Sequence, residues 1–231
     1  MGNAHIVGDL RKVSRLVAFD LDGTLVDSRR DLAESANQMV IELGGRPLAE
    51  ETVVGMVGEG ASVLVRRALA AAGLPDSPAA LDRFLEIYDE RLLHSTVVYP
   101  GMPEVVESAR RSARTAVLTN KPLRHTERLL EGLGIRPLFD DVVGGDGPHP
   151  RKPSPGGLRA LIAAAGATQE ATLMVGDSMV DDETARNAGV RCCLVTWGFG
   201  FSRIPPGTLP SDQQVADNAA DLAAIIERFF L

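Results

Sequence analysis

Aromatic residues and cysteines are both scarce in this sequence. Aromatic side chains make up 4% of its 231 residues, whereas apolar residues as a whole make up 45%. A core built mainly on valine, leucine and alanine is typical of an α/β protein and argues against a β-sandwich. The only two cysteines, Cys192 and Cys193, are neighbours in an apolar run and would point to opposite faces of a strand. We therefore interpret them as small buried hydrophobic side chains.

Long hydrophobic runs and clusters of basic residues are also missing. No stretch approaches the roughly 20 apolar residues that span a membrane, and the N-terminal segment lacks the apolar core of a signal peptide. The 24 lysine and arginine residues are scattered, and the formal net charge is −7. We expect a cytoplasmic protein that binds neither membranes nor nucleic acids. If it handles anions, the positive potential must come from a metal ion, a lysine or backbone N–H groups.

Five short apolar runs have the character of buried parallel strands. Helical patterns separate most of these runs, as in repeated βα units, so we expect an α/β fold with a parallel five-stranded sheet. In such sheets, ligands bind at the carboxyl ends of the strands. The predicted strands are Leu16–Phe19, Thr115–Leu118, Asp141–Gly144, Thr172–Val175 and Arg191–Val195.

A long insertion separates the first two predicted strands. It contains about ninety residues, far more than one crossover helix requires. Residues 29–43 place Leu32, Met39 and Leu43 on one helical face, and the segments 62–72 and 79–93 continue in helical style. The insertion is therefore predicted to be all-helical.

These patterns predict two domains. The helical domain would occupy residues 28–97, and the core would comprise residues 1–27 and 98–231. The chain would cross between the domains twice, near residues 26–28 and 97–101. Two adjacent linkers of this kind form a natural hinge.

The first predicted strand ends in a pair of carboxylates. The segment Asp20-Leu21-Asp22-Gly23-Thr24 places two aspartates one residue apart and follows them with glycine. For both carboxylates to take part in chemistry, we expect the chain to leave the strand immediately after Asp20, and Gly23 makes such a tight departure easier. On its own, the segment could equally be a polar turn.

Three further polar groups stand beside later strand ends. Seen separately, each has an ordinary explanation, such as a helix N-cap or a solvated lysine. Their order along the chain, each next to a predicted strand, favours one shared functional site. The groups are Thr119-Asn120-Lys121 after the second strand, Lys152 after the third, and Gly176-Asp177-Ser178 after the fourth, with Asp181 four residues beyond Asp177.

Together these segments resemble the four motifs of the haloacid dehalogenase superfamily. The resemblance covers essentially the whole core and implies a Rossmann-like sheet with a helical cap inserted after the first motif. Within the superfamily, the cap segment Val57-Gly-Glu-Gly-Ala61, the run Leu64–Leu69 and the segment Thr119-Asn-Lys-Pro122 most resemble bacterial phosphoglycolate phosphatases. The resemblance implies that the cap loop screens substrates, that Glu59, Gly60 and Arg66 bind them, and that 2-phosphoglycolate is the expected substrate.

The residue types in these motifs suit the hydrolysis of a phosphomonoester. Such a dianion repels nucleophiles, so its oxygens must be neutralised while a nucleophile approaches in line. Mg²⁺ prefers oxygen ligands, which Asp20, Asp177 and Asp22, the last through its backbone carbonyl, can supply. Lys152 adds a positive charge, and Thr119 can donate its hydroxyl to a phosphate oxygen.

The two aspartates of the first motif would have different chemical roles. Asp20 would attack phosphorus and form an aspartyl-phosphate. Asp22 would protonate the leaving group and later activate water. Further contacts to the phosphate are expected from Gly23, Thr24 and Asn120.

Two residues near the site have ambiguous roles. Asp181 would hold a water of the metal ion or orient Lys152, but it could also be only a helix-start residue. Trp197 could line the pocket or cover the end of the sheet, and we leave it outside the site.

Other functions remain compatible with the sequence. Dehalogenases and phosphonate hydrolases resemble this chain but lack the second acidic residue, so Asp22 argues against them. A sugar-phosphate mutase would retain both aspartates, and a non-catalytic phospholigand-binding module would usually lose one. Phosphatases of hexose phosphates, an amino-sugar acid phosphate, nucleotides or pyrophosphate are also alternatives. The oligomeric state cannot be predicted from the sequence.

Overall fold

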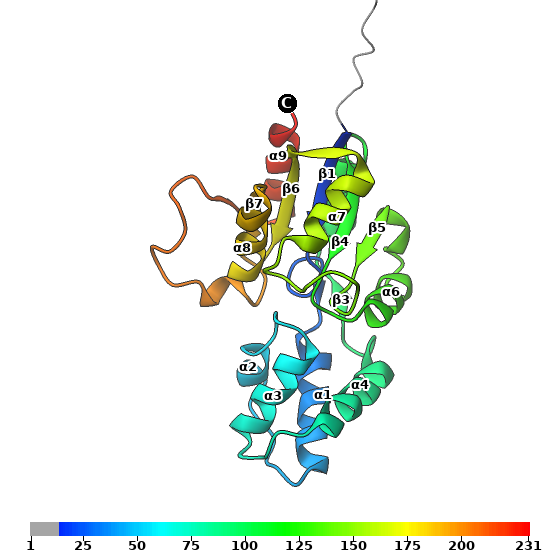
Figure 1. The fold of residues 1–231 in the computed structure, drawn as a ribbon, viewed down its shortest axis with the longest axis vertical. Coiled ribbons are helices and arrows are strands. Elements are labelled where there is room, and N and C mark those ends of the chain that lie inside the picture. The colour runs from blue at the N-terminus through cyan, green and yellow to red at the C-terminus, as the bar shows by residue number, and fades with distance from the viewer. Residues whose placement is uncertain (1–13) are drawn as a thin grey trace, which may run out of the picture.

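The computed structural model describes residues 14–231, and a single parallel sheet forms its centre (Figure 1). The strands of this sheet are β1 (Ser14–Phe19), β4 (Arg114–Leu118), β5 (Asp141–Val143), β6 (Ala167–Gly176), β7 (Arg191–Val195) and β8 (Gln214–Ala216). They pair in the order β5-β4-β1-β6-β7-β8, and every neighbouring pair is parallel.

The predicted parallel α/β fold is confirmed, but the predicted number of strands is wrong. The sheet has six strands rather than five, because β8 adds to the edge beside β7. The missed strand is only three residues long, Gln-Val-Ala, and two of the three are half-buried. An edge strand this short leaves no apolar run in the sequence that periodicity could detect.

Helices cover both faces of the sheet, as side-chain alternation along the strands requires. Phe19 and Cys193 belong to one apolar cluster, and Ala18 and Cys192 belong to the other. The two cysteines are therefore buried on opposite faces, as predicted. One face is covered by α5 (Met102–Arg110), α6 (Leu123–Gly132) and α9 (Ala219–Phe229), and the other by α7 (Gly156–Ala165) and α8 (Met179–Ala188). Short 3-10 turns occur at η1 (Arg136–Leu138) and η2 (Phe201–Arg203).

The predicted insertion is helical and lies beyond the carboxyl ends of the strands (Figure 1). Its apolar side chains continue the cluster that includes Phe19, so insertion and sheet share one core. On the first helix Leu32 and Met39 are buried, but Leu43, predicted on the same face, is 43% exposed because the helix ends one residue earlier. The helices are α1 (Arg29–Glu42), α2 (Glu50–Val54), α3 (Ala61–Ala71) and α4 (Pro78–Arg91), of which α2 was not predicted.

The two connections between insertion and sheet run side by side. They contain β2 (Val26–Asp27) and β3 (Val97–Val98), which pair as an antiparallel ribbon at the positions predicted for the linkers. The division into a cap at 28–97 and a core remains a prediction that this ribbon supports.

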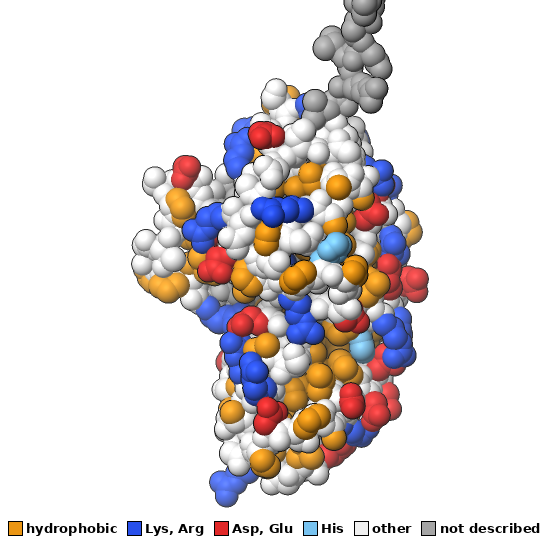
Figure 2. Space-filling model, viewed as in Figure 1, with side chains coloured by type: hydrophobic (Ala, Val, Ile, Leu, Met, Phe, Trp, Pro, Cys, Tyr) orange, Lys and Arg blue, Asp and Glu red, His pale blue; other side chains and the backbone are white. Residues whose placement is uncertain are grey.

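The space-filling surface is hollowed where insertion and sheet meet (Figure 2). None of the helices within residues 14–231 has the length and apolarity to cross a membrane.

Asp31 ties the two ends of the insertion together. It lies in the first turn of α1, is completely buried, and accepts hydrogen bonds from the backbone N–H groups of Ser95 and Thr96 at 2.9 and 2.8 Å. The Thr96 hydroxyl also donates to it, at 2.7 Å. Four donor contacts on one buried carboxylate fix the chain where it leaves the insertion.

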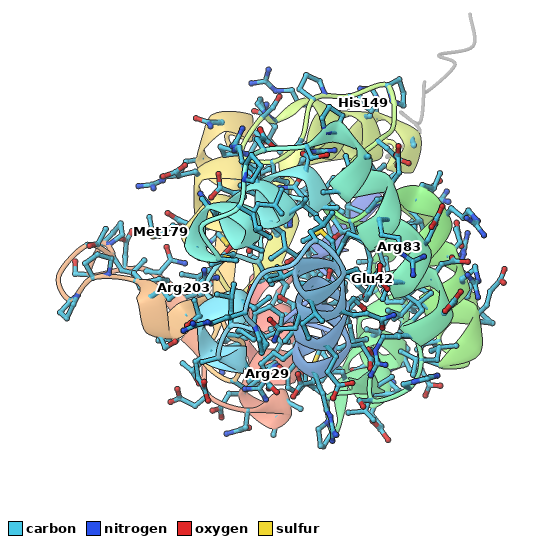
Figure 3. All side chains as sticks on the ribbon, turned by 90° about the horizontal axis from the view of Figure 1, so that it is seen from below. Arg29, Glu42, Arg83, His149, Met179 and Arg203 are labelled. Carbon is cyan, nitrogen blue, oxygen red and sulfur yellow. The ribbon has the colours of Figure 1, made fainter. Side chains whose placement is uncertain are left out.

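We predict that Asp31→Asn lowers the free energy of unfolding by about 2 kcal/mol. The amide replaces one acceptor oxygen by an NH₂ group, which cannot accept hydrogen bonds from the buried donors around it. The measurement is a urea unfolding midpoint with unchanged slope. Glu42→Gln is the control, since Glu42 makes its ion pair with Arg83 on the exposed surface, 2.6 Å between Nε and Oε2 (Figure 3). Equal midpoints for the two variants would contradict a special role for Asp31.

Candidate active site

Three of the predicted site residues follow neighbouring strands of the sheet. Asp20 follows β1, Thr119 follows β4 and Asp177 follows β6, and β1 pairs with both of the other strands. The carboxyl ends of these strands therefore meet at one place. The backbone N–H of Asp20 still donates to the carbonyl of Val175, at 2.8 Å, so the sheet fixes the position of this aspartate directly.

The chain leaves the sheet immediately after Asp20 in a tight loop. The N–H groups of Leu25 and Val26 both donate to the carbonyl of Leu21, and Gly23 takes a positive φ of 90°. A Cβ on Gly23 would lie 2.2 Å from Oδ2 of Asp177. Position 23 therefore requires glycine for two reasons, the positive φ of its backbone and the close approach of the Asp177 carboxylate.

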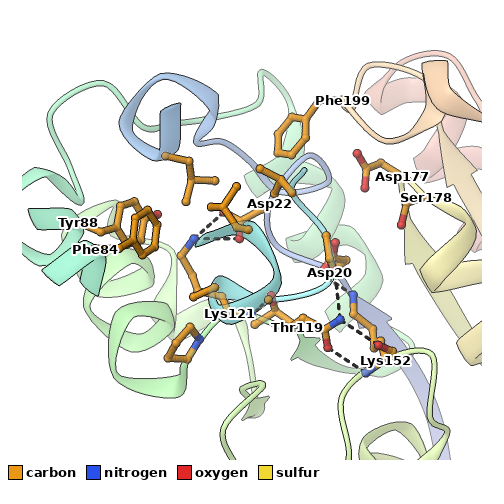
Figure 4. Close-up of a pocket in the computed structure, with 18 of the residues that line it drawn as sticks. Asp20, Asp22, Phe84, Tyr88, Thr119, Lys121, Lys152, Asp177, Ser178 and Phe199 are labelled. Carbon is orange, nitrogen blue, oxygen red and sulfur yellow. Dashed lines mark hydrogen bonds and ion pairs between the residues drawn. The ribbon is translucent and has the colours of Figure 1, made fainter. Parts of the chain in front are cut away.

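A pocket lies where these strand ends face the insertion (Figure 4). Its lining combines a polar floor from the core with an apolar wall from the insertion. The floor includes Asp20, Asp22, Thr119, Lys152 and Asp177, and the wall includes Leu32, Leu64, Phe84, Leu85 and Tyr88.

Three buried carboxylates form a cluster, and two of them, Asp20 and Asp177, line the pocket. Asp20, Asp177 and Asp181 each place an oxygen within 4.8 Å of the others. Lys152 lies among them, with Nζ 2.7 Å from Oδ1 of Asp20 and 2.6 Å from Oδ1 of Asp181. The side chain of Lys152 is 3% exposed, so these contacts are hardly screened by solvent.

The negative charge of this cluster exceeds its positive charge. Burial, and secondarily the nearby charge of Asp181, raises the pKa of Asp20 to about 7 in spite of Lys152. Burial and the other two aspartates also raise the pKa of Asp177 well above its usual range. The pKa of Lys152 is raised, because its carboxylate partners outweigh the effect of burial. One lysine does not neutralise the three acidic groups.

The cluster fits a divalent cation with a preference for oxygen ligands. Asp20 and Asp177 offer buried carboxylate oxygens, and an added cation would supply the positive charge that the cluster lacks. Asp181 is already engaged on both oxygens, by Lys152 on Oδ1 and by the N–H and hydroxyl of Ser178 on Oδ2. It therefore orients Lys152 and caps α8 at the same time, so the two alternatives left open from the sequence are both fulfilled.

Asp22 points away from the carboxylate cluster. Both of its oxygens lie 2.8 Å from Nζ of Lys121, and the hydroxyl of Ser28 donates to Oδ1 at 2.5 Å. Its side chain is thus not among the grouped oxygens of Asp20 and Asp177. The predicted metal contact through the backbone carbonyl of Asp22 remains a prediction.

Asn120 has a positioning role that the sequence did not indicate. Its Nδ2 donates to the carbonyls of Lys152 and Gly58, at 3.0 and 2.9 Å, and its Oδ1 accepts from the N–H of Lys152 at 2.8 Å. These bonds occupy the side chain and leave the backbone N–H of Asn120 for the predicted contact with phosphate, which remains a prediction. Thr119 accepts from the N–H of Lys121 at 3.1 Å, which leaves its hydroxyl proton available for a ligand.

Other predicted binding residues lie partly outside the pocket. Gly60 lines it, but Gly23 and Thr24 belong to the loop behind Asp20. Glu59 and Arg66 are exposed and do not line it, and Glu59 pairs with Arg67 on the surface. The cap loop turns Gly58 and Gly60 inward, and the charged side chains at its edge therefore point outward.

The sequence analysis also missed residues that line the pocket. Lys121 was noted only as part of its motif, although its place after a strand was a usable signal. Tyr88 and Phe199 gave no local signal, because their proximity depends on how the insertion packs and on the loop after β7. In that loop the N–H of Gly200 donates to Oδ2 of Asp177 at 2.7 Å, while Trp197 donates to the carbonyl of Thr24 at 3.3 Å and covers the sheet end.

Known proteins resemble this chain in both sequence and fold. The sequence matches the profile of the haloacid dehalogenase-like hydrolase family over residues 17–195. The chain belongs to this family. It is 42% identical over 205 residues to a phosphoglycolate phosphatase of Pseudomonas putida, with 85% of this chain and 75% of that protein covered. It is 44% identical over 204 residues to a phosphoglycolate phosphatase of Rhodospirillum rubrum, with 84% of each chain covered.

A solved structure extends the likeness to the fold. The crystal structure of a predicted phosphoglycolate phosphatase from Haemophilus somnus matches with a TM-score of 0.83 at 31% sequence identity. The match covers 93% of this chain and 97% of that one. The superfamily resemblance inferred from the motifs is thereby confirmed, and the chain is an enzyme of the hydrolase family.

The close approach of Gly23 to Asp177 yields a prediction with an internal control. Gly23→Ala and Gly44→Ala both place Cβ at positive φ, 90° and 84°, but Gly44 has no atom within 4 Å of that Cβ. Each variant should lose about 1–2 kcal/mol of stability from backbone strain. Only Gly23→Ala should also lose nearly all turnover, because its Cβ displaces the Asp177 carboxylate. Comparable activity in the two variants, measured alongside unfolding curves, would show that this contact does not matter.

Proposed function

We propose that this family member is a Mg²⁺-dependent phosphatase of small phosphomonoesters that works through an aspartyl-phosphate on Asp20. The observation that carries the proposal is the buried group of Asp20, Lys152 and Asp177 at adjoining strand ends, with Thr119 beside it in the same pocket. Carboxylates and a lysine in this arrangement offer a nucleophile, metal ligands and a positive charge within one enclosed site.

Asp20 and Asp177 would hold the Mg²⁺ ion, together with the backbone carbonyl of Asp22. Mg²⁺ favours carboxylate, carbonyl and water oxygens, and the absence of sulfur or imidazole from the group agrees with that preference. When bound, the ion would offset the charge of the phosphate oxygens.

The first chemical step forms a bond between an Asp20 carboxylate oxygen and phosphorus while the ester P–O bond breaks. Lys152 and the Thr119 hydroxyl stabilise the charge on the phosphate oxygens during this exchange. The leaving alkoxide takes its proton from Asp22. For this role Asp22 must give up part of its contact with Lys121 and Ser28 and form a hydrogen bond with the leaving oxygen instead.

The second step hydrolyses the intermediate. Asp22, now a carboxylate, accepts a proton from a water molecule that attacks phosphorus. The bond between phosphorus and the Asp20 oxygen breaks, and phosphate leaves with the enzyme restored. Splitting the displacement into two steps replaces one difficult reaction by two easier ones.

The proposed substrate is 2-phosphoglycolate, which would yield glycolate and phosphate. Two relatives named phosphoglycolate phosphatase are 42% and 44% identical to the chain over most of its length, which supports this choice.

We further propose that residues 28–97 act as a cap that opens for substrate exchange and closes for chemistry. In this structure the cap loop is held by the core: Arg203 donates to the carbonyl of Val57 at 3.1 Å, and Asn120 donates to that of Gly58. Figure 3 shows Arg203 beside the helices of the insertion. Such bonds to backbone carbonyls support a closed arrangement that limits stray water.

A substrate panel tests the proposed function. Steady-state kinetics with Mg²⁺ should rank 2-phosphoglycolate first by kcat/KM among hexose phosphates, an amino-sugar acid phosphate, nucleotides and pyrophosphate. Metal removal with a chelator should abolish turnover, and Mg²⁺ should restore it. If 2-phosphoglycolate fell more than about a hundredfold below the best compound, roughly 2.7 kcal/mol in transition-state binding, the substrate assignment would be wrong.

The two duties of Asp22 can be separated with leaving groups of different basicity. In Asp22→Asn an alkyl phosphate should lose about 10²–10⁴-fold in turnover, because its alkoxide leaves poorly without a proton. An aryl phosphate needs little help, so p-nitrophenyl phosphate should give a burst of one phenol per enzyme and then slow hydrolysis. Rapid mixing detects the burst. Equal slowing of both substrates without a burst would assign Asp22 a structural role instead.

A further inference from the structure

We infer that Lys121 and Tyr88 form a second anion subsite, which selects phosphomonoesters that carry a carboxylate close to the ester carbon. The inference rests on the proposed phosphatase function and assigns the residues that read the part of the substrate other than its phosphate. Lys121 comes from the core after β4, and Tyr88 comes from α4 of the insertion. The subsite is therefore complete only when the insertion lies against the core.

Lys121 is a buried cation at the wall of the pocket. Its side chain is 4% exposed, and its one ionic partner among the described residues is Asp22. The ammonium nitrogen lies 4.8 Å from the ring centre of Tyr88. A cation packed against an aromatic face and withdrawn from water binds an anion much more strongly than an exposed lysine does.

The other cationic side chains of the pocket are committed elsewhere. Lys152 is held by Asp20 and Asp181, and its charge belongs to the phosphate end of the site. Arg203 donates to backbone carbonyls of the cap loop. Of the cations that line the pocket within residues 14–231, Lys121 is thus the one placed to meet a second acidic group of a ligand.

Tyr88 supplies a hydroxyl whose proton has no acceptor within residues 14–231. The residue is 2% exposed, and its polar neighbour Lys121 can only donate to the hydroxyl oxygen, so the hydroxyl proton is left without an acceptor among the described residues. The ring of Tyr88 is fixed by stacking on Phe84 and His125, whose ring centres lie 5.8 and 5.7 Å from its own. Burial raises the pKa of Tyr88 to about 12, so the hydroxyl keeps its proton and can donate it. A buried donor without an acceptor is costly unless a ligand provides one.

The two ends of the pocket carry separate positive charges. Figure 4 shows Lys121, beside Tyr88 and Phe84, on one side of Asp22, and Lys152, beside Asp20, on the other. A small ligand with a phosphate at one end and a carboxylate at the other matches this division. The apolar side chains around Lys121 leave few other polar groups for a neutral substrate to contact.

A substrate carboxylate at Lys121 would also compete with Asp22. At present both oxygens of Asp22 contact the ammonium group. A second carboxylate that takes part of this contact frees Asp22 to approach the leaving oxygen. Recognition of the carboxylate therefore affects the first chemical step as well as binding, and a neutral substrate would lose kcat together with affinity.

The test compares 2-phosphoglycolate with O-phosphoglycolamide, which has the same length but a neutral amide. The wild-type enzyme should favour the carboxylate by about tenfold or more in kcat/KM. Lys121→Met should bring this ratio close to one, because the wild-type preference is the effect of one buried charged hydrogen bond. Tyr88→Phe, which keeps the ring, should reduce it by about threefold to tenfold. Arg124→Met is the control, because it also removes a positive charge but from the exposed surface, where Arg124 pairs with Asp89, and it should leave the ratio unchanged.

A wild-type ratio near one would overturn the inference, even if both compounds are hydrolysed and the phosphatase function stands. Equal losses for both compounds in Lys121→Met would also overturn it, since Lys121 would then serve only Asp22.

A binding measurement is independent of turnover. Calorimetry on Asp20→Asn should show 2-phosphoglycolate binding more tightly than the amide, and the added Lys121→Met should remove the difference. That result supports the subsite even if no compound is hydrolysed and the proposed function fails. Equal affinities in Asp20→Asn would refute the subsite.

Discussion

The contact of Lys152 with Asp20 and Asp181 is the interaction on which the rest of the site depends. It holds a nucleophile candidate and a helix-capping aspartate to one ammonium group in a nearly dry environment. Burial, and secondarily the charge of Asp181, raises the pKa of Asp20. A single lysine also leaves the three-carboxylate group with excess negative charge, which explains its fit to a divalent cation. The charge imbalance favours metal binding and, once a cation is bound, the approach of a phosphate dianion.

The fold brings this charge arrangement about through its topology. Because β1 lies between β4 and β6, residues distant in sequence meet at one edge of the sheet. The insertion then closes the open side with an apolar wall, and Asn120 links the two by bonding both Lys152 and the Gly58 loop. The same asparagine therefore positions both Lys152 and the Gly58 loop, so a movement of the insertion would alter the geometry of the pocket floor.

The sequence predicted what depends on local patterns and missed what depends on packing. Apolar runs located β1, β4, β5, β6 and β7, and polar residues after the strands pointed to Asp20, Lys152 and Asp177. The short edge strand β8 left no such run. Glu59 and Arg66 were expected in the pocket, but charge in a cap motif does not specify which side of the loop faces inward. Tyr88 contacts Lys121 only because α4 packs over α6, a relation that periodicity does not encode.

Identification of the residue that carries phosphate during turnover tests the central claim most directly. The enzyme would be mixed with 2-phosphoglycolate and Mg²⁺, quenched in acid within milliseconds, and reduced with borohydride, which converts an aspartyl-phosphate to homoserine. Peptide mass spectrometry then locates the change. The account predicts homoserine at Asp20, in amounts that rise and fall with turnover and vanish without substrate. Modification at another carboxylate, or none while phosphate is released at full rate, would contradict it.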